Sequence, residues 1–227
     1  GDQFRLWVCG MVLYLCDLLP LQLKFNVKVH LSRSAIELQV GSFGDYTTLE
    51  EIFLERVYEI PDNFKPRAIV DLGSNIGIGI AYFALRHPQA RIWAYEPDPN
   101  NWQRLQVNVN RLQQVRFAKV AVAAKTGTAQ FSTDRHRGTS SGLAQEVNAQ
   151  SVTVETQSLD CILESIGLPQ IDLVKFDIEG AEYEVFESFT QWERVRAFSG
   201  ELHELEVPGA PERLCAVFKN KGYKVDT

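Results

Sequence analysis

The sequence predicts an α/β fold with a doubly wound, mostly parallel sheet, preceded by an N-terminal extension of helix and strands. From Arg67 onward, short apolar runs typical of buried strands alternate with helix-like stretches. The connections between them are short, which places successive strand–helix units side by side in one parallel sheet. A length of 227 residues is enough for one substantial core.

The first part of the chain follows a different pattern. The apolar stretch Leu6–Leu23 is interrupted by Asp17 and Pro20, so we expect a buried or docking helix and no stable membrane insertion. Period-two alternation predicts two half-buried strands, and a turn cluster then leads into a helix. In chain order these are the strands Leu23–Leu31 and Ala35–Val40, the turn Gly41–Asp45 and the helix Thr48–Leu54. We therefore expect residues 1–66 to form an extension that packs on a second unit, residues 67–227.

The second unit begins with Ala68–Leu72, a continuous apolar run of the kind found in strands buried on both faces. The later predicted strands are Arg91–Tyr95, Val115–Val122, Thr128–Ser132, Val152–Thr156, Ile171–Phe176, Val195–Leu202 and Tyr223–Val225. The predicted helices are Ile76–Arg86, Pro99–Leu112, Ser158–Ile166, Ala181–Phe189 and Pro211–Lys219. Asp134–Gly142 is polar and rich in Gly and Ser, which predicts a loop.

Composition narrows the function classes. Twenty-three Lys and Arg against 29 Asp and Glu give a net charge of -6, which disfavours binding to nucleic acid. The four cysteines form no CxxC pair, as expected of reduced thiols in a cytoplasmic protein. The apolar N-terminal stretch is a candidate surface for a second subunit, which would make the protein a homodimer.

The turn after the first buried strand is the first candidate ligand site, because ligands of open α/β sheets bind beyond the carboxyl ends of the strands. Its glycines, Gly73, Gly77 and Gly79, allow a tight turn and close approach of a ligand to the main chain. The dinucleotide pattern GxGxxG is not met, since Tyr82 stands where the third glycine belongs. Asp71 suits a cation such as the ammonium of a methionine moiety better than a pyrophosphate.

The second buried strand ends in Glu96, 23 positions after Gly73. A carboxylate at this distance is placed to accept hydrogen bonds from ribose hydroxyls. The alternatives are that Asp71 only caps the turn and that Glu96 only begins the next helix. Both acids together, in order and at strand ends, favour a nucleotide-like ligand.

Five segments of the chain resemble the FkbM family of S-adenosylmethionine-dependent methyltransferases. They are GDYTTLEEIF (Gly44–Phe53), VDLGSNIGIGI (Val70–Ile80), YEPDPNN (Tyr95–Asn101), KVAVAAKTGTAQF (Lys119–Phe131) and LVKFDIEGAEYEVF (Leu173–Phe186). The resemblance implies a Rossmann-like class I fold with S-adenosylmethionine as cofactor. It also implies transfer of a methyl group to a hydroxyl of a small molecule, such as a natural product or a sugar.

The resemblance also implies roles for single residues. It assigns Asp71, Gly73, Asn75 and Gly77 to the methionine end of the cofactor and Glu96 to its ribose. We also expect Ser74 and Asp177 to be cofactor-binding residues. Class I folds usually end in a β-hairpin, whereas only one short terminal strand is predicted here. Either another segment, such as the N-terminal strands, completes the sheet, or the chain is trimmed.

The candidate catalytic residues are Asp177, Glu179 and His203, which follow two later strands. A hydroxyl acceptor must lose a proton, and the candidate bases are Asp177 and His203, whose intrinsic pKa suits work near neutrality. Capping of a helix is the alternative for Glu179 and Glu182. Lys175, in an apolar strand, needs a partner, and we expect a neighbouring acid such as Glu201.

Three further hypotheses accompany this interpretation. Asp177, Glu179 and His203 could hold Mg²⁺, but no ligand spacing supports it and we predict no metal. The loop Arg135–Ser141 either folds over the acceptor, with Arg135 or Arg137 meeting an anionic group, or is a mobile surface connection. The rival functions are an NAD-dependent oxidoreductase, which would need the missing GxGxxG turn, and a non-catalytic binding module.

Overall fold

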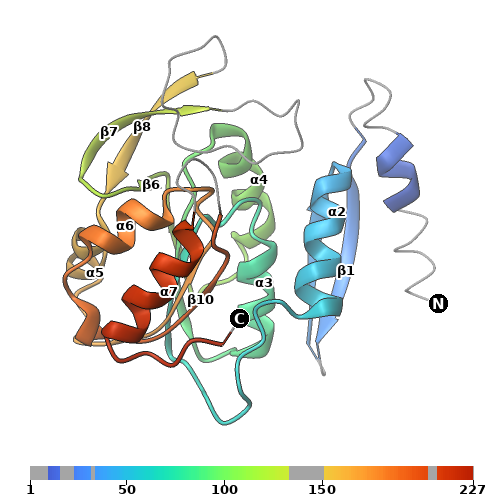
Figure 1. The fold of residues 1–227 in the computed structure, drawn as a ribbon. Coiled ribbons are helices and arrows are strands. Elements are labelled where there is room, and N and C mark those ends of the chain that lie inside the picture. The colour runs from blue at the N-terminus through green and yellow to red at the C-terminus, as the bar shows by residue number, and fades with distance from the viewer. Residues whose placement is uncertain (1–9, 16–22, 32–33, 133–150, 204–208, 227) are drawn as a thin grey trace.

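The centre of the protein is a parallel sheet of five strands in the order β10-β9-β3-β4-β5, as seen in a computed structural model (Figure 1). The structure describes residues 10–15, 23–31, 34–132, 151–203 and 209–226. The strands are β3 (Ala68–Leu72), β4 (Arg91–Tyr95), β5 (Val115–Ala118), β9 (Ile171–Phe176) and β10 (Val195–Gly200). The chain winds from β3 outward to β5 and then returns to the other side of β3. The predicted doubly wound sheet is thus confirmed, with its switch point between β3 and β9.

Helices cover both faces of this sheet (Figure 1). On one face lie α3 (Ile78–Arg86) and α4 (Pro99–Val109); on the other lie α5 (Leu159–Ile166), α6 (Glu182–Ser188) and α7 (Ala210–Asn220), with the short 3-10 helix Trp192–Arg194 before β10. Every residue of β3 is buried because its side chains alternate between the two cores: Ile69 packs in the first, and Val70 and Leu72 in the second. Among the helices of the described residues, none is long and apolar enough to cross a membrane.

Local capping fixes where the helices begin. Asp98 accepts hydrogen bonds from the N–H groups of Asn100 and Asn101 and precedes Pro99, an arrangement that favours a helix start. Ser42 and Asp45 form a capping box, so α2 (Phe43–Glu50) begins inside the predicted turn cluster and five residues before the predicted start at Thr48. The turn assignment for Gly41–Asp45 was therefore wrong, and a short π-helix, Glu51–Glu55, follows α2.

The extension forms a layer of its own beside α3 and α4 (Figure 1). Its strands β1 (Phe25–Leu31) and β2 (Ser34–Val40) pair with each other, antiparallel, and within the described residues they do not join the central sheet. Of the two alternatives given for the end of the sheet, completion by these N-terminal strands is therefore wrong. The predicted terminal strand Tyr223–Val225 is also not formed, because this segment is held by a side chain instead. The phenol of Tyr223 donates to the carbonyls of Trp192 and Val195, at 2.8 and 2.7 Å.

A second, three-stranded sheet lies above the first (Figure 1). It contains β6 (Ala121–Val122), β7 (Gly127–Ser132) and β8 (Ser151–Gln157), with β7 and β8 antiparallel. The predicted strand Val115–Val122 is therefore two strands, β5 in one sheet and β6 in the other. The predicted loop Arg135–Ser141 lies outside the described residues.

Asn108, buried on α4, joins the extension to the core. Its side-chain oxygen accepts the N–H of Gln39 on β2 at 2.7 Å. Its side-chain nitrogen donates to the carbonyls of Ile76, in the glycine turn, and Gln39, at 2.8 and 3.3 Å. One amide group therefore satisfies main-chain groups of two units that are far apart in the sequence.

We predict that Asn108→Ala lowers the free energy of unfolding by about 2–4 kcal/mol, because it leaves buried main-chain groups of Gln39 and Ile76 without partners. Urea denaturation of both proteins measures the difference. The control is Gln106→Ala on the exposed side of the same helix, for which a change within about 0.5 kcal/mol is expected. Equal effects of the two substitutions would contradict the bridging role of Asn108.

Candidate active site

An open cleft lies at the carboxyl ends of β3, β4 and β9. This is where the switch point of the sheet predicts a ligand site. The cleft is lined by Gly73, Asn75, Tyr95, Glu96, Pro97, Asn101, Val120, Ala121, Val122, Phe131, Asp177, Ile178 and Glu179.

The glycine turn is held at the edge of this cleft by the neighbouring strand. The N–H groups of Gly73 and Ser74 both donate to the carbonyl of Tyr95 at 3.0 Å. The hydroxyl of Ser74 accepts the N–H of Tyr95 and donates to the carbonyl of Asp71, both at 3.1 Å. Ser74 therefore braces the turn from behind and, within the described residues, does not line the cleft.

Two glycines of the turn are required by close contacts. Gly73 has φ +75°, and a Cβ at this position would lie 1.8 Å from the carbonyl oxygen of Asp177. Gly77 has φ +89°, and a Cβ there would lie 2.8 Å from a methyl of Val109 on α4. Gly73 thus allows the ends of β3 and β9 to meet at the cleft, whereas Gly77 serves the packing of α3 against α4.

Asp71 lies beneath the turn, fully buried, and does not face the cleft. Its partner is Lys175 of β9, whose ammonium is 3.2 Å from Asp71 Oδ1 and donates to the Gly73 carbonyl at 2.8 Å. Desolvation lowers the pKa of Lys175, but the Asp71 carboxylate outweighs it and the net shift is upward, so the ammonium is charged. Lys175 thus pairs with a neighbouring acid as expected, but that acid is Asp71 and not Glu201. Asp71 meets a cation as expected, but that cation is the protein's own.

Glu96 lies directly after β4 and lines the cleft, as predicted for a ribose ligand. Its two oxygens accept the N–H groups of Asn75 and Asp98, at 2.7 and 2.9 Å. Burial raises the pKa of Glu96 to about 7, against the opposing effect of these two hydrogen bonds. Its charge therefore changes close to neutral pH.

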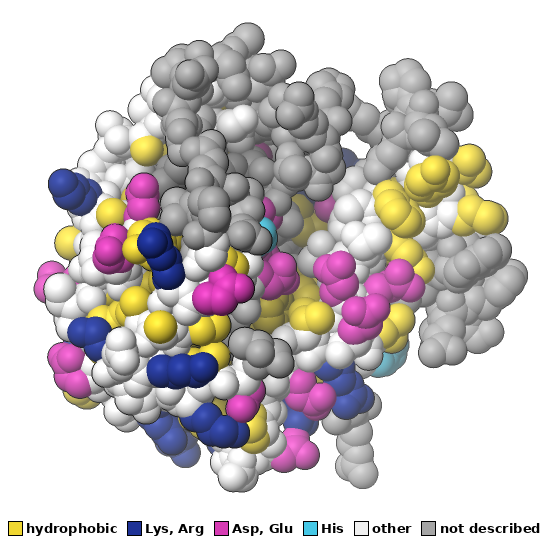
Figure 2. Space-filling view, viewed as in Figure 1, with side chains coloured by type: hydrophobic (Ala, Val, Ile, Leu, Met, Phe, Trp, Pro, Cys, Tyr) yellow, Lys and Arg dark blue, Asp and Glu magenta, His cyan; other side chains and the backbone are white. Residues whose placement is uncertain are grey.

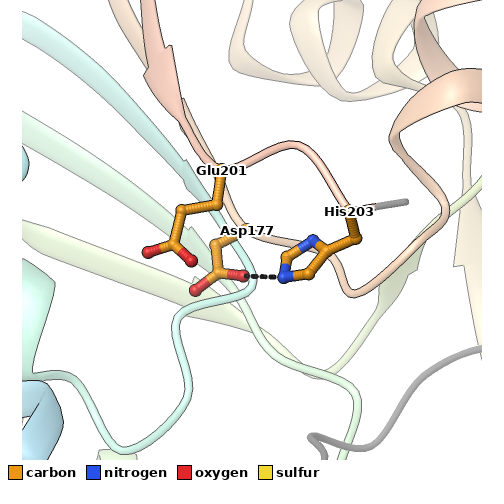
Figure 3. Close-up of side chains that lie close together, drawn as sticks. All are labelled: Asp177, Glu201 and His203. Carbon is orange, nitrogen blue, oxygen red and sulfur yellow. Dashed lines mark ion pairs between the residues drawn. The ribbon is translucent and has the colours of Figure 1, made fainter. Parts of the chain in front are cut away.

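The other edge of the cleft gathers the candidate catalytic residues. Asp177 and Glu179 follow β9, and Glu201 and His203 follow β10; Figure 3 shows Asp177, Glu201 and His203 side by side. His203 Nε2 lies 3.5 Å from Glu179 Oε2 and 3.9 Å from Asp177 Oδ1. The predicted juxtaposition of Asp177, Glu179 and His203 is thus present, because β9 and β10 are parallel neighbours.

Glu182 controls the state of His203. Its carboxylate is buried and accepts the N–H groups of Ile178 and Gly180, at 3.2 and 2.8 Å, so it closes the loop that begins α6. It also lies 2.9 Å from His203 Nδ1. This hydrogen bond, with the charges of Glu182, Glu179 and Asp177, raises the pKa of His203 to about 9. His203 is therefore protonated at neutral pH, and Asp177 is the other residue predicted from the sequence as a candidate base.

The group of side chains that could hold a metal ion differs from the group considered from the sequence. Asp177, Glu201 and His203 offer ligand atoms within 4.8 Å of one another, so Glu201 replaces Glu179 in the group. At neutral pH a metal would have to displace the proton on His203. The sequence-based expectation of no metal stays a prediction.

Tyr58, which the sequence analysis did not single out, also reaches this edge. Its hydroxyl lies 3.1 Å from Glu201 Oε1 and 3.5 Å from Asp177 Oδ2. The available signal was a tyrosine in the polar connection before β3, which has no pattern that points to a site.

Acidic side chains gather across the middle of the face shown in Figure 2, over α2 and toward the C-terminal half of the protein.

Comparison with known proteins identifies the family. Residues 71–225 match the sequence family described as the methyltransferase FkbM domain. This match covers more than half of the chain. The chain belongs to the FkbM methyltransferase family.

Individual relatives agree with this assignment. This chain is 28% identical over 211 residues to methyltransferase sdnD of Sordaria araneosa, covering 78% of this chain and 81% of the relative. It is 30% identical over 133 residues to 2-O-methyltransferase NoeI of Sinorhizobium fredii, covering 52% of this chain and 55% of the relative. It is 24% identical over 210 residues to 31-O-demethyl-FK506 methyltransferase FkbM of Streptomyces tacrolimicus, covering 77% and 80%. Among solved structures, Aeropyrum pernix fibrillarin with bound S-adenosyl-L-methionine aligns with a TM-score of 0.45 and 13% identity, over 79% of this chain and 66% of that one.

As a member of the FkbM methyltransferase family, this chain uses S-adenosylmethionine, and the residues that line its cleft suit that cofactor. Glu96 presents a carboxylate whose orientation is fixed by two main-chain N–H groups. Gly73 leaves its main chain accessible because it has no side chain. Tyr95, Val120 and Phe131 give the cleft apolar surface against which the adenine ring of the cofactor would pack. Of the predicted cofactor-binding residues, Gly73, Asn75, Glu96 and Asp177 line the cleft, while Asp71, Ser74 and Gly77 support it from behind.

We predict that Gly73→Ala destabilises the protein far more than Gly167→Ala. Both glycines have a left-handed φ, but a Cβ on Gly167 would meet no atom within 4 Å. Gly167→Ala should therefore lower the free energy of unfolding by only about 1 kcal/mol, the cost of an alanine in the left-handed region. Gly73→Ala should lower it by at least ~2 kcal/mol more, because the Asp177 carbonyl must move. Urea denaturation provides the comparison, and equal losses would argue against a close contact between the ends of β3 and β9.

We predict that cofactor affinity follows the charge of Glu96. If Glu96 binds the ribose as predicted, its ionised carboxylate would accept the hydrogen bonds of the ribose hydroxyls, and the proton that it holds below pH 7 would have to leave first. The Kd of S-adenosylhomocysteine should therefore rise roughly tenfold as the pH falls from 8 to 6. Calorimetric titration should show weaker binding without this pH dependence in Glu96→Gln, and the wild-type dependence in the exposed control Glu37→Gln. A pH dependence retained in Glu96→Gln would assign it to another group.

Proposed function

We propose that this chain methylates a hydroxyl group of a small molecule, with Asp177 as the base that accepts the hydroxyl proton. The observation that carries the proposal is the position of the Asp177 carboxylate. It lines the same cleft as Glu96, and its Oδ1 atom is buried without a hydrogen-bond partner among the described residues. A carboxylate oxygen of this kind is ready to accept a proton from an incoming hydroxyl.

S-adenosylmethionine, when bound, supplies an electrophilic methyl group on a sulfonium. Glu96 and the main chain of Gly73 and Asn75 hold the cofactor, with Glu96 on the ribose. Asp177 would take the O–H proton of the acceptor when its oxygen is methylated. The imidazolium of His203 lies 3.9 Å from Asp177 Oδ1, on the side of the cleft where the acceptor would bind. Most of the acceleration then comes from alignment, which can contribute roughly 7–11 kcal/mol.

The class of acceptor is supported by the relatives. The names 2-O-methyltransferase and 31-O-demethyl-FK506 methyltransferase refer to methylation of an oxygen, and the second gives an FK506 derivative as the molecule methylated. Hexuronic acid methyltransferase AglP of Haloferax volcanii, 30% identical over 121 residues, acts on a sugar acid by its name. The proposed acceptor is accordingly a hydroxylated natural product or sugar.

We also propose that residues 67–227 form the methyltransferase unit and that residues 1–66 are an extension packed on it. Contacts of β1 and β2 with α3, and of β2 with α4, support this division. The homodimer, the cytoplasmic location and the absence of nucleic-acid binding stay predictions. The exposed side chains of Met11, Tyr14 and Leu15 are the surface on which a second subunit would pack.

Binding and transfer assays test the proposed function against its rivals. S-adenosylmethionine and S-adenosylhomocysteine should raise the melting temperature with increasing concentration, and NAD should not. Stabilisation by NAD alone would indicate an oxidoreductase. Stabilisation by none of the three ligands would indicate a binding module.

In the same experiment Asp177→Asn should keep its cofactor-induced stabilisation. Its transfer of labelled methyl to a panel of glycosides and polyketide alcohols should fall by about 10²–10⁴-fold, since the base is lost. Asp226→Asn, on the exposed C-terminal segment, is the matched control and should keep wild-type turnover. Unchanged turnover in Asp177→Asn would remove Asp177 as the base.

A further inference from the structure

Tyr58 belongs to the extension but is enclosed by the methyltransferase unit. It lies in the connection between the π-helix Glu51–Glu55 and β3, and its side chain is only 4% exposed. Its ring stacks against Phe83 of α3, with centroids 6.4 Å apart. The ammonium of Lys175 lies 5.3 Å from the centre of the same ring. Packing on both sides therefore fixes where the phenol oxygen can be.

The phenol oxygen is placed between two carboxylates that come from different strands. Glu201 Oε1, after β10, is 3.1 Å away, and Asp177 Oδ2, after β9, is 3.5 Å away. A phenol has one hydrogen to donate and lone pairs to accept with. The shorter contact indicates donation to Glu201, which leaves a lone pair of the phenol oxygen on the side of Asp177.

The charged groups around the phenol keep it protonated. Asp177, Glu201 and Asp71 all face it, and burial with these charges raises the pKa of Tyr58 above its usual range. Lys175, on the ring face, is the cation nearest to the ring and is held by Asp71. The same negative charge, together with burial, raises the pKa of Glu51 in the adjoining π-helix. The phenol is thus a neutral donor in a site rich in carboxylates.

Glu201 differs from Asp177 in its access to water. Glu201 is exposed, whereas Asp177 is partly enclosed and its Oδ1 atom is buried. A proton taken up by Asp177 needs a way out before the next turnover. The row Asp177, Tyr58 and Glu201 connects the cleft with the surface.

We propose that Tyr58 is a positioning residue for methyl transfer, whose hydroxyl orients Asp177 and passes the acceptor's proton on to Glu201. The carboxyl group of protonated Asp177 turns so that its proton lies beside Tyr58, and it then gives this proton to the phenol oxygen while the phenol hydrogen moves to Glu201 Oε1. One O–H bond forms and one breaks on the phenol oxygen, so Tyr58 is unchanged, and Glu201 releases the proton to water. This proposal rests on the proposed function.

Tyr58 lies before the part of the chain that matches the family, which begins at residue 71. The extension would therefore be part of the active site of this chain and more than a packing layer. Asp177, after β9, and Glu201, after β10, would be connected by Tyr58, which comes from the extension.

Tyr58→Phe tests the proposal because it keeps the ring against Phe83 and Lys175 and removes only the hydroxyl. The kcat for methyl transfer should fall by about 10- to 100-fold. The KM for S-adenosylmethionine should stay within about twofold, and the pH–rate profile should change shape as proton release becomes rate-limiting. The matched control is Tyr82→Phe, which removes the hydroxyl of a second buried tyrosine 5.6 Å from the same Phe83 ring. It should keep the wild-type kcat and pH profile.

A double-mutant cycle with Glu201→Gln separates positioning from general stability. If the proton leaves through both groups, Tyr58→Phe and the double variant should have the same kcat, because the second substitution interrupts a path that is already broken. Multiplicative losses would overturn the relay, and so would a wild-type kcat and pH profile in Tyr58→Phe. A Tyr58→Phe protein with a lower melting temperature and equally impaired cofactor binding would show a structural role and overturn the proposal as well. A wild-type chain that binds S-adenosylhomocysteine yet transfers no methyl group to any acceptor would overturn the proposed function and this inference together.

Discussion

The buried pair of Asp71 and Lys175 is the interaction on which the site depends. It joins β3 to β9 at the point where the winding of the sheet reverses, and Lys175 also holds the carbonyl of Gly73. An apolar pair could match its contribution to stability, since removing two charges from water is costly. An apolar pair could not hold a carbonyl, however. The turn, the contact of Gly73 with the Asp177 main chain and the position of the Asp177 side chain all follow from this arrangement.

Carboxylates outnumber cations around the cleft among the described side chains. Glu96, Asp177 and Glu179 line it and Glu201 lies beside Asp177, while Lys175 is engaged by Asp71 and His203 by Glu182. A negative cleft favours a ligand with positive charge, and a sulfonium cofactor carries one. The hydrogen bond with Glu182 keeps His203 protonated. The positive charge of this imidazolium partly offsets the negative charge of the surrounding carboxylates. The same residue that closes the loop before α6 thereby sets the protonation of the site.

The extension and the methyltransferase unit are coupled at two places. Asn108 ties β2 to the main chain of the glycine turn, and Tyr58 lies among the side chains at the opposite edge of the cleft. Movement of the extension would therefore disturb both the cofactor side and the acceptor side. A layer outside the sheet is in this way tied to the geometry of the cleft.

Local patterns in the sequence determined the strands β3, β4 and β9, the helix starts capped by Asp98 and Ser158, the glycine turn, and Glu96 as a cleft residue. These features depend on neighbours within a few positions, so hydrophobic runs, capping residues and glycines predict them. Only the tertiary structure decided that Lys175 pairs with Asp71, that His203 is charged, that Tyr58 enters the site and that β1 and β2 stay outside the sheet. Each of these depends on distances of a few ångströms between segments far apart in the chain, and strand order and packing, which no local pattern encodes, set those distances.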